Sequence, residues 1–70
     1  NNGQYIHMAM EYLPEDFAVG QMRAEYKKSA LLHDAVIPSV VQREGIFVVS
    51  LCNAQGSPFA VVEFTRTKKK

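Results

Sequence analysis

Apolar residues recur every three or four positions near the start of the chain, a spacing that predicts an amphipathic helix. One face of this helix carries Tyr5, Met8, Ala9 and Tyr12. Asn1 or Asn2 can cap the first turn, because an asparagine side chain accepts hydrogen bonds from the free N–H groups there. Pro14 has no N–H group and restricts the residue before it, so it ends the pattern. We therefore expect a helix over about residues 3–13.

The apolar period changes to two after the helix, which is the period of a β-strand. Met22, Ala24 and Tyr26 alternate with charged residues, and this alternation predicts a half-buried strand with one wet face. Three further apolar segments follow, separated by a loop and two turns. The four strands are expected at about residues 17–28, 35–43, 46–53 and 59–67.

Particular residues indicate where some strands lie in the sheet. Pro38 cannot donate to a ladder, so it places residues 35–43 at an edge or a bulge. Residues 46–53 are the most continuous apolar stretch and are expected to be central and covered on both faces. Glu44 and Gly45 form a tight hairpin signal. Together these patterns predict an α+β fold, with one helix packed across a four-stranded antiparallel sheet in meander order.

The size of the chain limits its stability and its class. A chain of 70 residues forms at most one small domain, and 47% hydrophobic residues is too apolar for disorder. One core of this size rarely supplies more than about 3–5 kcal/mol. The longest apolar run is far shorter than the roughly 20 residues of a membrane span, and no secretory signal is visible. We expect a cytoplasmic chain with no membrane span that depends on a partner or on a further part of its domain.

The distribution of charge does not alter the predicted fold. The formal net charge is +1, and the basic tail at 68–70 supplies three of the eight basic residues. A terminal lysine run is typical of a solvated end, with a phosphate-binding tail as the alternative. Because the chain begins with Asn1 rather than Met, we expect that it starts inside a longer protein.

Two groups of polar residues have the types that catalysis or metal binding needs. His7 and Glu11 are four positions apart and could share a helix face, but a zinc site needs three or four ligands. Ser29, His33 and Asp34 have the residue types of a nucleophilic triad. Adjacent histidine and aspartate side chains diverge on a strand, so a polar loop is the expected structure and no metal or other cofactor is expected.

Two further features have a structural and a functional interpretation. Cys52 lies in the most apolar segment, where a cysteine behaves as a small hydrophobic residue rather than a nucleophile. Arg23, Lys27 and Lys28 could form a basic strand for nucleic acid, but the wet face of a strand explains them equally well. No glycine-rich phosphate loop accompanies them, so no nucleic-acid partner is expected. From its residues alone the chain shows a fold class and no reaction.

Two segments resemble a known enzyme family. The opening Asn1-Asn2-Gly3-Gln4-Tyr5 resembles the end of the motif D-x-N-x-H-V-N-N-x-x-Y, which opens the central helix of hotdog-fold thioesterases. The segment E-Y-K-K-S-A-L-L-H-D at residues 25–34 resembles the E-Y-[KR]-[KR]-E-[AC] segment of fatty acyl-ACP thioesterases. The resemblance runs from residue 1 to about 66 and includes the order of one helix followed by four strands.

The resemblance implies a partial hotdog-like domain over residues 1–67 and the hydrolysis of fatty acyl-ACP to a free fatty acid. The family's catalytic Asp, Asn and His all precede residue 1, so no catalytic residue is expected in this chain and it should be inactive alone. The family's carboxylate position is occupied by Ser29, its cysteine position by Ala30 and its loop glycine by His33. A serine cannot polarise a histidine or a water as a carboxylate does.

The resemblance also implies a substrate site on the helix. The helix start at Asn1, Asn2 and Gly3 would hold the oxyanion with backbone N–H groups. The acyl chain would lie in an apolar slot, whose expected lining is Tyr5, Met8, Ala9 and Tyr12. The alternative is that these four residues are simply part of the core.

The partners implied are acyl carrier protein or acyl-CoA, and another hotdog unit in a homodimer or a tandem chain. Residues 17–28 are the expected pairing edge, so a proline at Arg23 or Glu25 should weaken association more than one at Ser39. Two other functions stay open: an acyl-CoA hotdog thioesterase, and a non-catalytic module that binds an acyl group or only dimerises.

Overall fold

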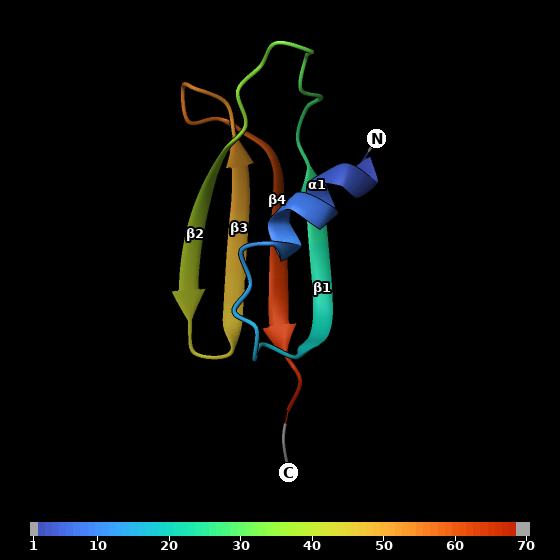
Figure 1. The fold of residues 1–70 in the computed structure, drawn as a ribbon, viewed down its shortest axis with the longest axis vertical. Helices are drawn as coiled ribbons and strands as arrows, with labels where there is room; N and C mark the ends of the chain where they lie inside the picture. The colour runs from blue at the N-terminus through green and yellow to red at the C-terminus, as the bar shows by residue number, and fades with distance from the viewer. Residues whose placement is uncertain (1, 69–70) are drawn as a thin grey trace.

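The computed structural model describes residues 2–68 as one helix followed by four strands (Figure 1). Helix α1 spans Asn2–Met10, and the strands are β1 (Val19–Tyr26), β2 (Ile37–Arg43), β3 (Ile46–Cys52) and β4 (Pro58–Arg66). The bounds of the strands lie within two residues of those expected from the sequence. The fold is therefore α+β, with one helix and a four-stranded antiparallel sheet.

The strands are not arranged as a meander, and that prediction was wrong. Their order in the sheet is β1-β4-β3-β2, so β1 pairs with β4 and the connection after β1 crosses the end of the sheet to reach β2. A meander would have placed β2 inside the sheet, where Pro38 would leave one ladder bond unmade. The observed order puts β2 at an edge and the two most apolar strands, β3 and β4, at the centre. The edge position predicted from Pro38 is confirmed.

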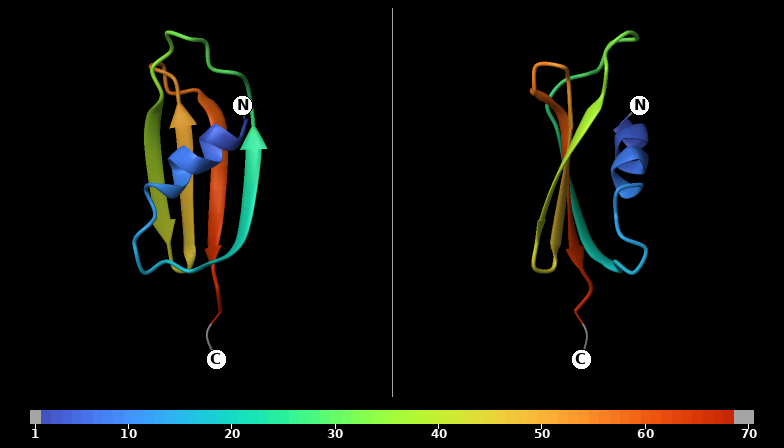
Figure 2. Two further views of the ribbon diagram at one scale, coloured as in Figure 1. Left: turned by 45° about the vertical axis from the view of Figure 1, so that its right-hand side comes forward. Right: turned by 60° about the vertical axis from the view of Figure 1, so that its left-hand side comes forward.

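Strand β3 is central as expected, but the prediction that both of its faces are covered was wrong. Its side chains on the helix side, Phe47, Val49 and Leu51, are buried. Those on the opposite face, such as Ile46 and Val48, remain partly exposed. The reason is that one short helix covers one face only, and Figure 2 shows α1 on a single side of the sheet.

Helix α1 ends at Met10 instead of residue 13. The N–H groups of Glu11 and Tyr12 donate to carbonyl oxygens three residues back, at 3.2 and 3.1 Å. The Leu13 N–H likewise donates to the Met10 carbonyl oxygen at 3.1 Å. These bonds make a tight turn of 3₁₀ type, which is common where a helix ends before a proline. No helix among residues 2–68 is long and apolar enough to cross a membrane.

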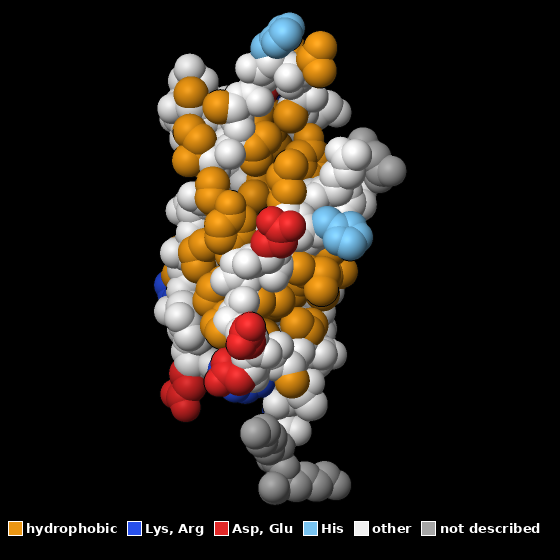
Figure 3. Space-filling view, viewed as in Figure 1, with side chains coloured by type: hydrophobic (Ala, Val, Ile, Leu, Met, Phe, Trp, Pro, Cys, Tyr) orange, Lys and Arg blue, Asp and Glu red, His pale blue; other side chains and the backbone are white. Residues whose placement is uncertain are grey.

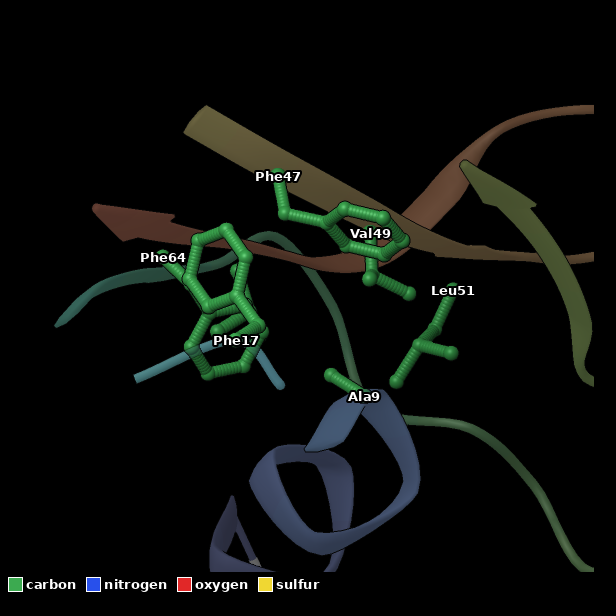
Figure 4. Close-up of a cluster of buried hydrophobic side chains, with 7 residues drawn as sticks. Ala9, Phe17, Phe47, Val49, Leu51 and Phe64 are labelled. Atoms are coloured by element: carbon green, nitrogen blue, oxygen red, sulfur yellow. The ribbon is translucent and has the colours of Figure 1, made fainter. Parts of the chain in front are cut away.

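The hydrophobic core lies between α1 and the centre of the sheet (Figure 4). It consists of Ala9, Phe17, Phe47, Val49, Leu51, Val62 and Phe64. Phe17, expected in a strand, instead lies in the turn before β1, and its ring meets Phe47 edge to face at 6.0 Å between centroids. The Arg66 guanidinium lies 4.9 Å from the centroid of the Phe17 ring, so a cation–π contact closes this end of the core.

Strand β1 is more exposed than its alternating pattern predicted. Met22 lies opposite Phe64 and Ala24 opposite Val62, which places this side of β1 on the helix side of the sheet. Nevertheless all eight residues of β1 are exposed, so the prediction of a half-buried strand was wrong. Helix α1 packs mainly against β3 and β4 and meets the apolar side of β1 through the contact of Tyr5 with Tyr26, which leaves most of that side open.

Candidate functional site

The start of the helix and the segment after β1 meet, although they are far apart in sequence. The Ala30 N–H donates a hydrogen bond to the Tyr5 hydroxyl oxygen at 3.0 Å, across 25 positions of sequence. The Tyr5 ring also lies beside the ring of Tyr26, with 6.4 Å between centroids and an angle of 42° between the rings. We call the group formed by Tyr5, Tyr26, Ser29 and Ala30 the Tyr5 junction.

The backbone at the end of β1 determines where the Tyr5 junction begins. The N–H groups of Lys27 and Lys28 both donate to the Phe59 carbonyl oxygen, at 2.7 and 3.3 Å. The Lys28 ammonium group lies 5.8 Å from the centroid of the Phe59 ring. Because two successive N–H groups share one acceptor, the chain leaves the sheet at this point, and Ser29 follows directly in the loop.

The apolar pattern of the helix predicts the face on which Tyr5 lies, but it does not reveal the hydrogen bond that the Tyr5 hydroxyl accepts. A phenol can accept and donate at once, and the bond from Ala30 uses only its acceptor capacity. Within residues 2–68 no acceptor receives the Tyr5 O–H. A partly buried O–H of this kind can donate to the carbonyl oxygen of a ligand.

The other expected substrate-binding residues have different environments. Ala9 is completely buried in the core, so it lines no open slot, as the core interpretation held. Met8 and Tyr12 are both exposed. Gly3 lies in the first turn of α1, only the backbone of Asn2 is described, and Asn1 falls outside the described residues.

The two polar groups found in the sequence do not form catalytic sites. His7 and Glu11 are exposed, no ion pair joins them, and Glu11 lies beyond the last residue of α1. The Asp34 carboxylate accepts a hydrogen bond from the Leu31 N–H at 2.7 Å instead of orienting His33. The side chain of Asp34 therefore stabilises a turn within this polar loop.

The described residues also give no support to a metal site or a basic binding strip. Over residues 2–68, no group of three or more His, Cys, Asp or Glu side chains lies close enough together to hold a metal ion. Lys27 forms an ion pair with Glu25 at 2.8 Å, which interrupts the row of positive charge along β1. Cys52 is a buried free thiol at the end of β3.

One open hollow of the structure lies away from the Tyr5 junction. It has a volume of about 900 Å³, is open to solvent, and is lined by residues 42–46 and 65–68 at the other end of the sheet. Its lining is the hairpin turn between β2 and β3 and the end of β4. The candidate site therefore rests on the hydrogen bond and ring contact of Tyr5 rather than on this hollow.

No family model matches this chain, and neither a curated protein nor a solved structure shows significant similarity to it.

Replacing Tyr5 with phenylalanine tests whether its hydroxyl holds the loop. Tyr5→Phe leaves the Ala30 N–H without its acceptor, at a cost of about 1 kcal/mol, or about fivefold in the opening equilibrium. We expect the Ala30 amide to exchange with solvent about fivefold faster, as measured by NMR hydrogen exchange. The matched control, Tyr12→Phe, alters an exposed tyrosine and should leave this rate unchanged. An Ala30 amide that exchanges at the same rate in both variants would contradict the contact.

Proposed function

We propose that this chain is part of a hotdog-type thioesterase that hydrolyses the thioester of fatty acyl-ACP to a free fatty acid. The observation that carries the proposal is the hydrogen bond between Tyr5 and Ala30. It joins the two segments that resemble fatty acyl-ACP thioesterases, the helix start and residues 25–34. The α+β arrangement, with one helix across an antiparallel sheet, is compatible with a hotdog unit.

The groups that would catalyse the proposed reaction lie partly in this chain and partly in a segment that would precede it. A water molecule, activated by the Asp and His of a preceding D-x-N-x-H segment, attacks the thioester carbonyl carbon. The C–S bond then breaks, and the leaving thiolate takes up a proton. Backbone N–H groups at the start of α1 would stabilise the oxyanion, because the helix dipole favours negative charge there. The Tyr5 O–H would donate to the same carbonyl or to a neighbouring polar atom of the substrate.

The acyl chain needs an apolar surface next to this polar end. Val40 of β2 lies opposite the buried Val49, on the helix side of the sheet, yet remains exposed because α1 does not cover β2. Hydrophobic side chains gather beside the helix on this face of the molecule (Figure 3). We propose that the acyl chain lies along this uncovered strip, with Met8 or Tyr12 at its border.

A second candidate function, a non-catalytic acyl-binding module, is favoured by Ser29. The carboxylate position of the family carries a serine here, and Ser29 is exposed with no hydrogen-bond partner among residues 2–68. A serine hydroxyl without an adjacent base removes no proton from water at neutral pH. Such a module would bind the acyl group by the same apolar strip and would release no product.

The test is the hydrolysis of acyl-ACP and acyl-CoA by the parent protein, with the 70-residue chain alone as an inactive reference. If position 29 faces the reacting water, Ser29→Glu should raise the rate by about tenfold or more, since a positioned general base contributes at least that much. The matched control is Ser39→Glu, which places the same charge on an exposed residue of β2 and should change nothing.

Three outcomes decide between the two functions. Turnover that rises only with Ser29→Glu supports the thioesterase. Acyl binding without turnover, in a parent protein that lacks a preceding Asp-x-Asn-x-His, supports the binding module. Turnover by the 70-residue chain alone, or equal rates for both serine variants, contradicts the assignment of position 29.

A further inference from the structure

Leu31 and Leu32 are the most exposed large hydrophobic residues that the structure describes, at 73% and 92% of their full accessible surface. They lie in the connection between β1 and β2, which projects beyond the end of the sheet in Figure 1. The space-filling view shows hydrophobic atoms beside a histidine at this extreme end of the molecule (Figure 3). Isolated exposed leucines are common, but two adjacent ones at a projecting tip form a single apolar contact surface.

The tip is held in this outward position by its own hydrogen bonds. Asp34 Oδ2 accepts from the Leu31 N–H at 2.7 Å, and the Asp34 N–H donates to the Leu31 carbonyl oxygen at 3.0 Å. One residue earlier, the Ala30 N–H is anchored on Tyr5. The leucine side chains are therefore presented to solvent by a turn that is fixed at both ends.

The charges around the tip favour a surface that carries negative charge. Lys27 and Lys28 lie at the base of the loop. Lys27 is already paired with Glu25 at 2.8 Å, whereas Lys28 has no carboxylate partner among residues 2–68, so Lys28 is the lysine that can meet an anionic surface. The other connection at this end of the sheet, residues 53–57, has no charged side chain. Asp34 is the one acidic residue in these two connections, and its carboxylate accepts the Leu31 N–H within the turn.

The shape of the tip favours a lipid surface over a folded protein. A specific protein interface buries roughly 800 Å² on each partner, and two leucine side chains supply only a small part of that area. A convex apolar tip has no groove to fit a protein partner. A bilayer interface adapts to any shape, takes up apolar side chains among its acyl chains, and attracts nearby lysines to anionic headgroups.

We propose that the loop at residues 27–34 binds the surface of an anionic bilayer, with Leu31 and Leu32 inserted and Lys28 beside the lipid phosphates. This binding is peripheral and involves one end of the molecule only. It rests on the loop geometry and not on the proposed thioesterase activity, so either proposal can fail while the other stands.

A single tryptophan at the tip reports insertion directly, because the chain contains no tryptophan of its own. Leu32→Trp should show a blue-shifted emission on addition of phosphatidylcholine vesicles that contain phosphatidylserine, and bromine on the lipid acyl chains should quench it. The matched control is Met10→Trp, at a position of the helix that is also exposed. Its emission should not shift. Equal emission of both variants with and without vesicles would overturn the proposal.

Vesicle flotation separates the tip from the lysine tail, which could also attract anionic lipid. Replacing both leucines with serine should lower the fraction bound at least tenfold, given the transfer free energy of two leucine side chains. Lys28→Gln should lower it by about fivefold, and Lys27→Gln should have a smaller effect because Lys27 is already paired with Glu25. Changing the three lysines at 68–70 to glutamine should leave the dependence on the leucines intact.

Two results would overturn the proposal, provided that circular dichroism shows each variant folded. One is vesicle binding that persists when both leucines are replaced with serine and is lost when the three lysines at 68–70 are replaced with glutamine. The other is a leucine variant that binds vesicles normally but loses self-association in sedimentation, which would assign the tip to a protein contact.

Discussion

Leu51→Ala should leave a large fraction of the molecules unfolded at room temperature, whereas Leu32→Ala should leave the stability unchanged. Leu51 is 1% exposed and belongs to the core cluster beneath α1, while Leu32 is 92% exposed. Truncating a buried leucine costs about 2.7–5 kcal/mol, which is comparable to the roughly 3–5 kcal/mol that a core of this size supplies. The same substitution at the exposed position removes almost no buried contact and should cost under about 0.5 kcal/mol.

Urea denaturation followed by far-ultraviolet circular dichroism measures both effects. The Leu51→Ala chain should show a markedly reduced strand signal even without urea, and the Leu32→Ala chain should unfold at the urea concentration of the unmodified chain. Similar midpoints for the two variants would mean that the cluster between α1 and the sheet is not what stabilises the fold.

Ala24→Pro should strongly weaken pairing of the chain through β1 while leaving the fold intact. Lys27 and Phe59 form a hydrogen-bonded pair of the β1–β4 ladder, because the Lys27 N–H donates to the Phe59 carbonyl oxygen at 2.7 Å. Hydrogen-bonded pairs alternate along an antiparallel ladder. The N–H of Ala24 therefore points away from β4, to the open edge of the sheet, where a second chain would accept it.

The same alternation corrects the proline positions chosen from the sequence. Arg23 and Glu25 lie opposite Glu63 and Val61, in register with the hydrogen-bonded pair at Lys27, so their N–H groups point toward β4. A proline at either position would break the sheet itself instead of testing its edge. Arg23→Pro thus becomes the control that unfolds the chain, next to Ala24→Pro, which should only weaken association.

Sedimentation velocity at micromolar concentration distinguishes these outcomes. The unmodified chain should sediment as a dimer, and Ala24→Pro as a folded monomer, with a dissociation constant raised roughly a hundredfold by the lost hydrogen bond and the steric clash. A stable monomer of the unmodified chain, or a dimer that tolerates Ala24→Pro, would show that β1 is not a pairing edge.

Local structure was predictable from the sequence because it depends on neighbours in the chain. The three-to-four and two-residue periods of apolar side chains predict the helix and the four strands. The hairpin at Glu44 and Gly45 follows from the backbone freedom of glycine, and Gly45 adopts a φ of 74° that other residues rarely take. Pro38 likewise indicates an edge strand, since its missing N–H group is tolerated only there.

The order of the strands and the candidate site were decided only by the tertiary structure. Alternation determines which face of a strand a side chain occupies, but it does not determine which strand lies next to it, so β1 could not be assigned to β4 in advance. The exposure of β1 and of Val40 depends on how far one helix of nine residues reaches across four strands. The contact between Tyr5 and Ala30 spans 25 positions, and no local rule relates residues at that separation. It forms because α1 lies across the sheet near the point where the chain leaves β1.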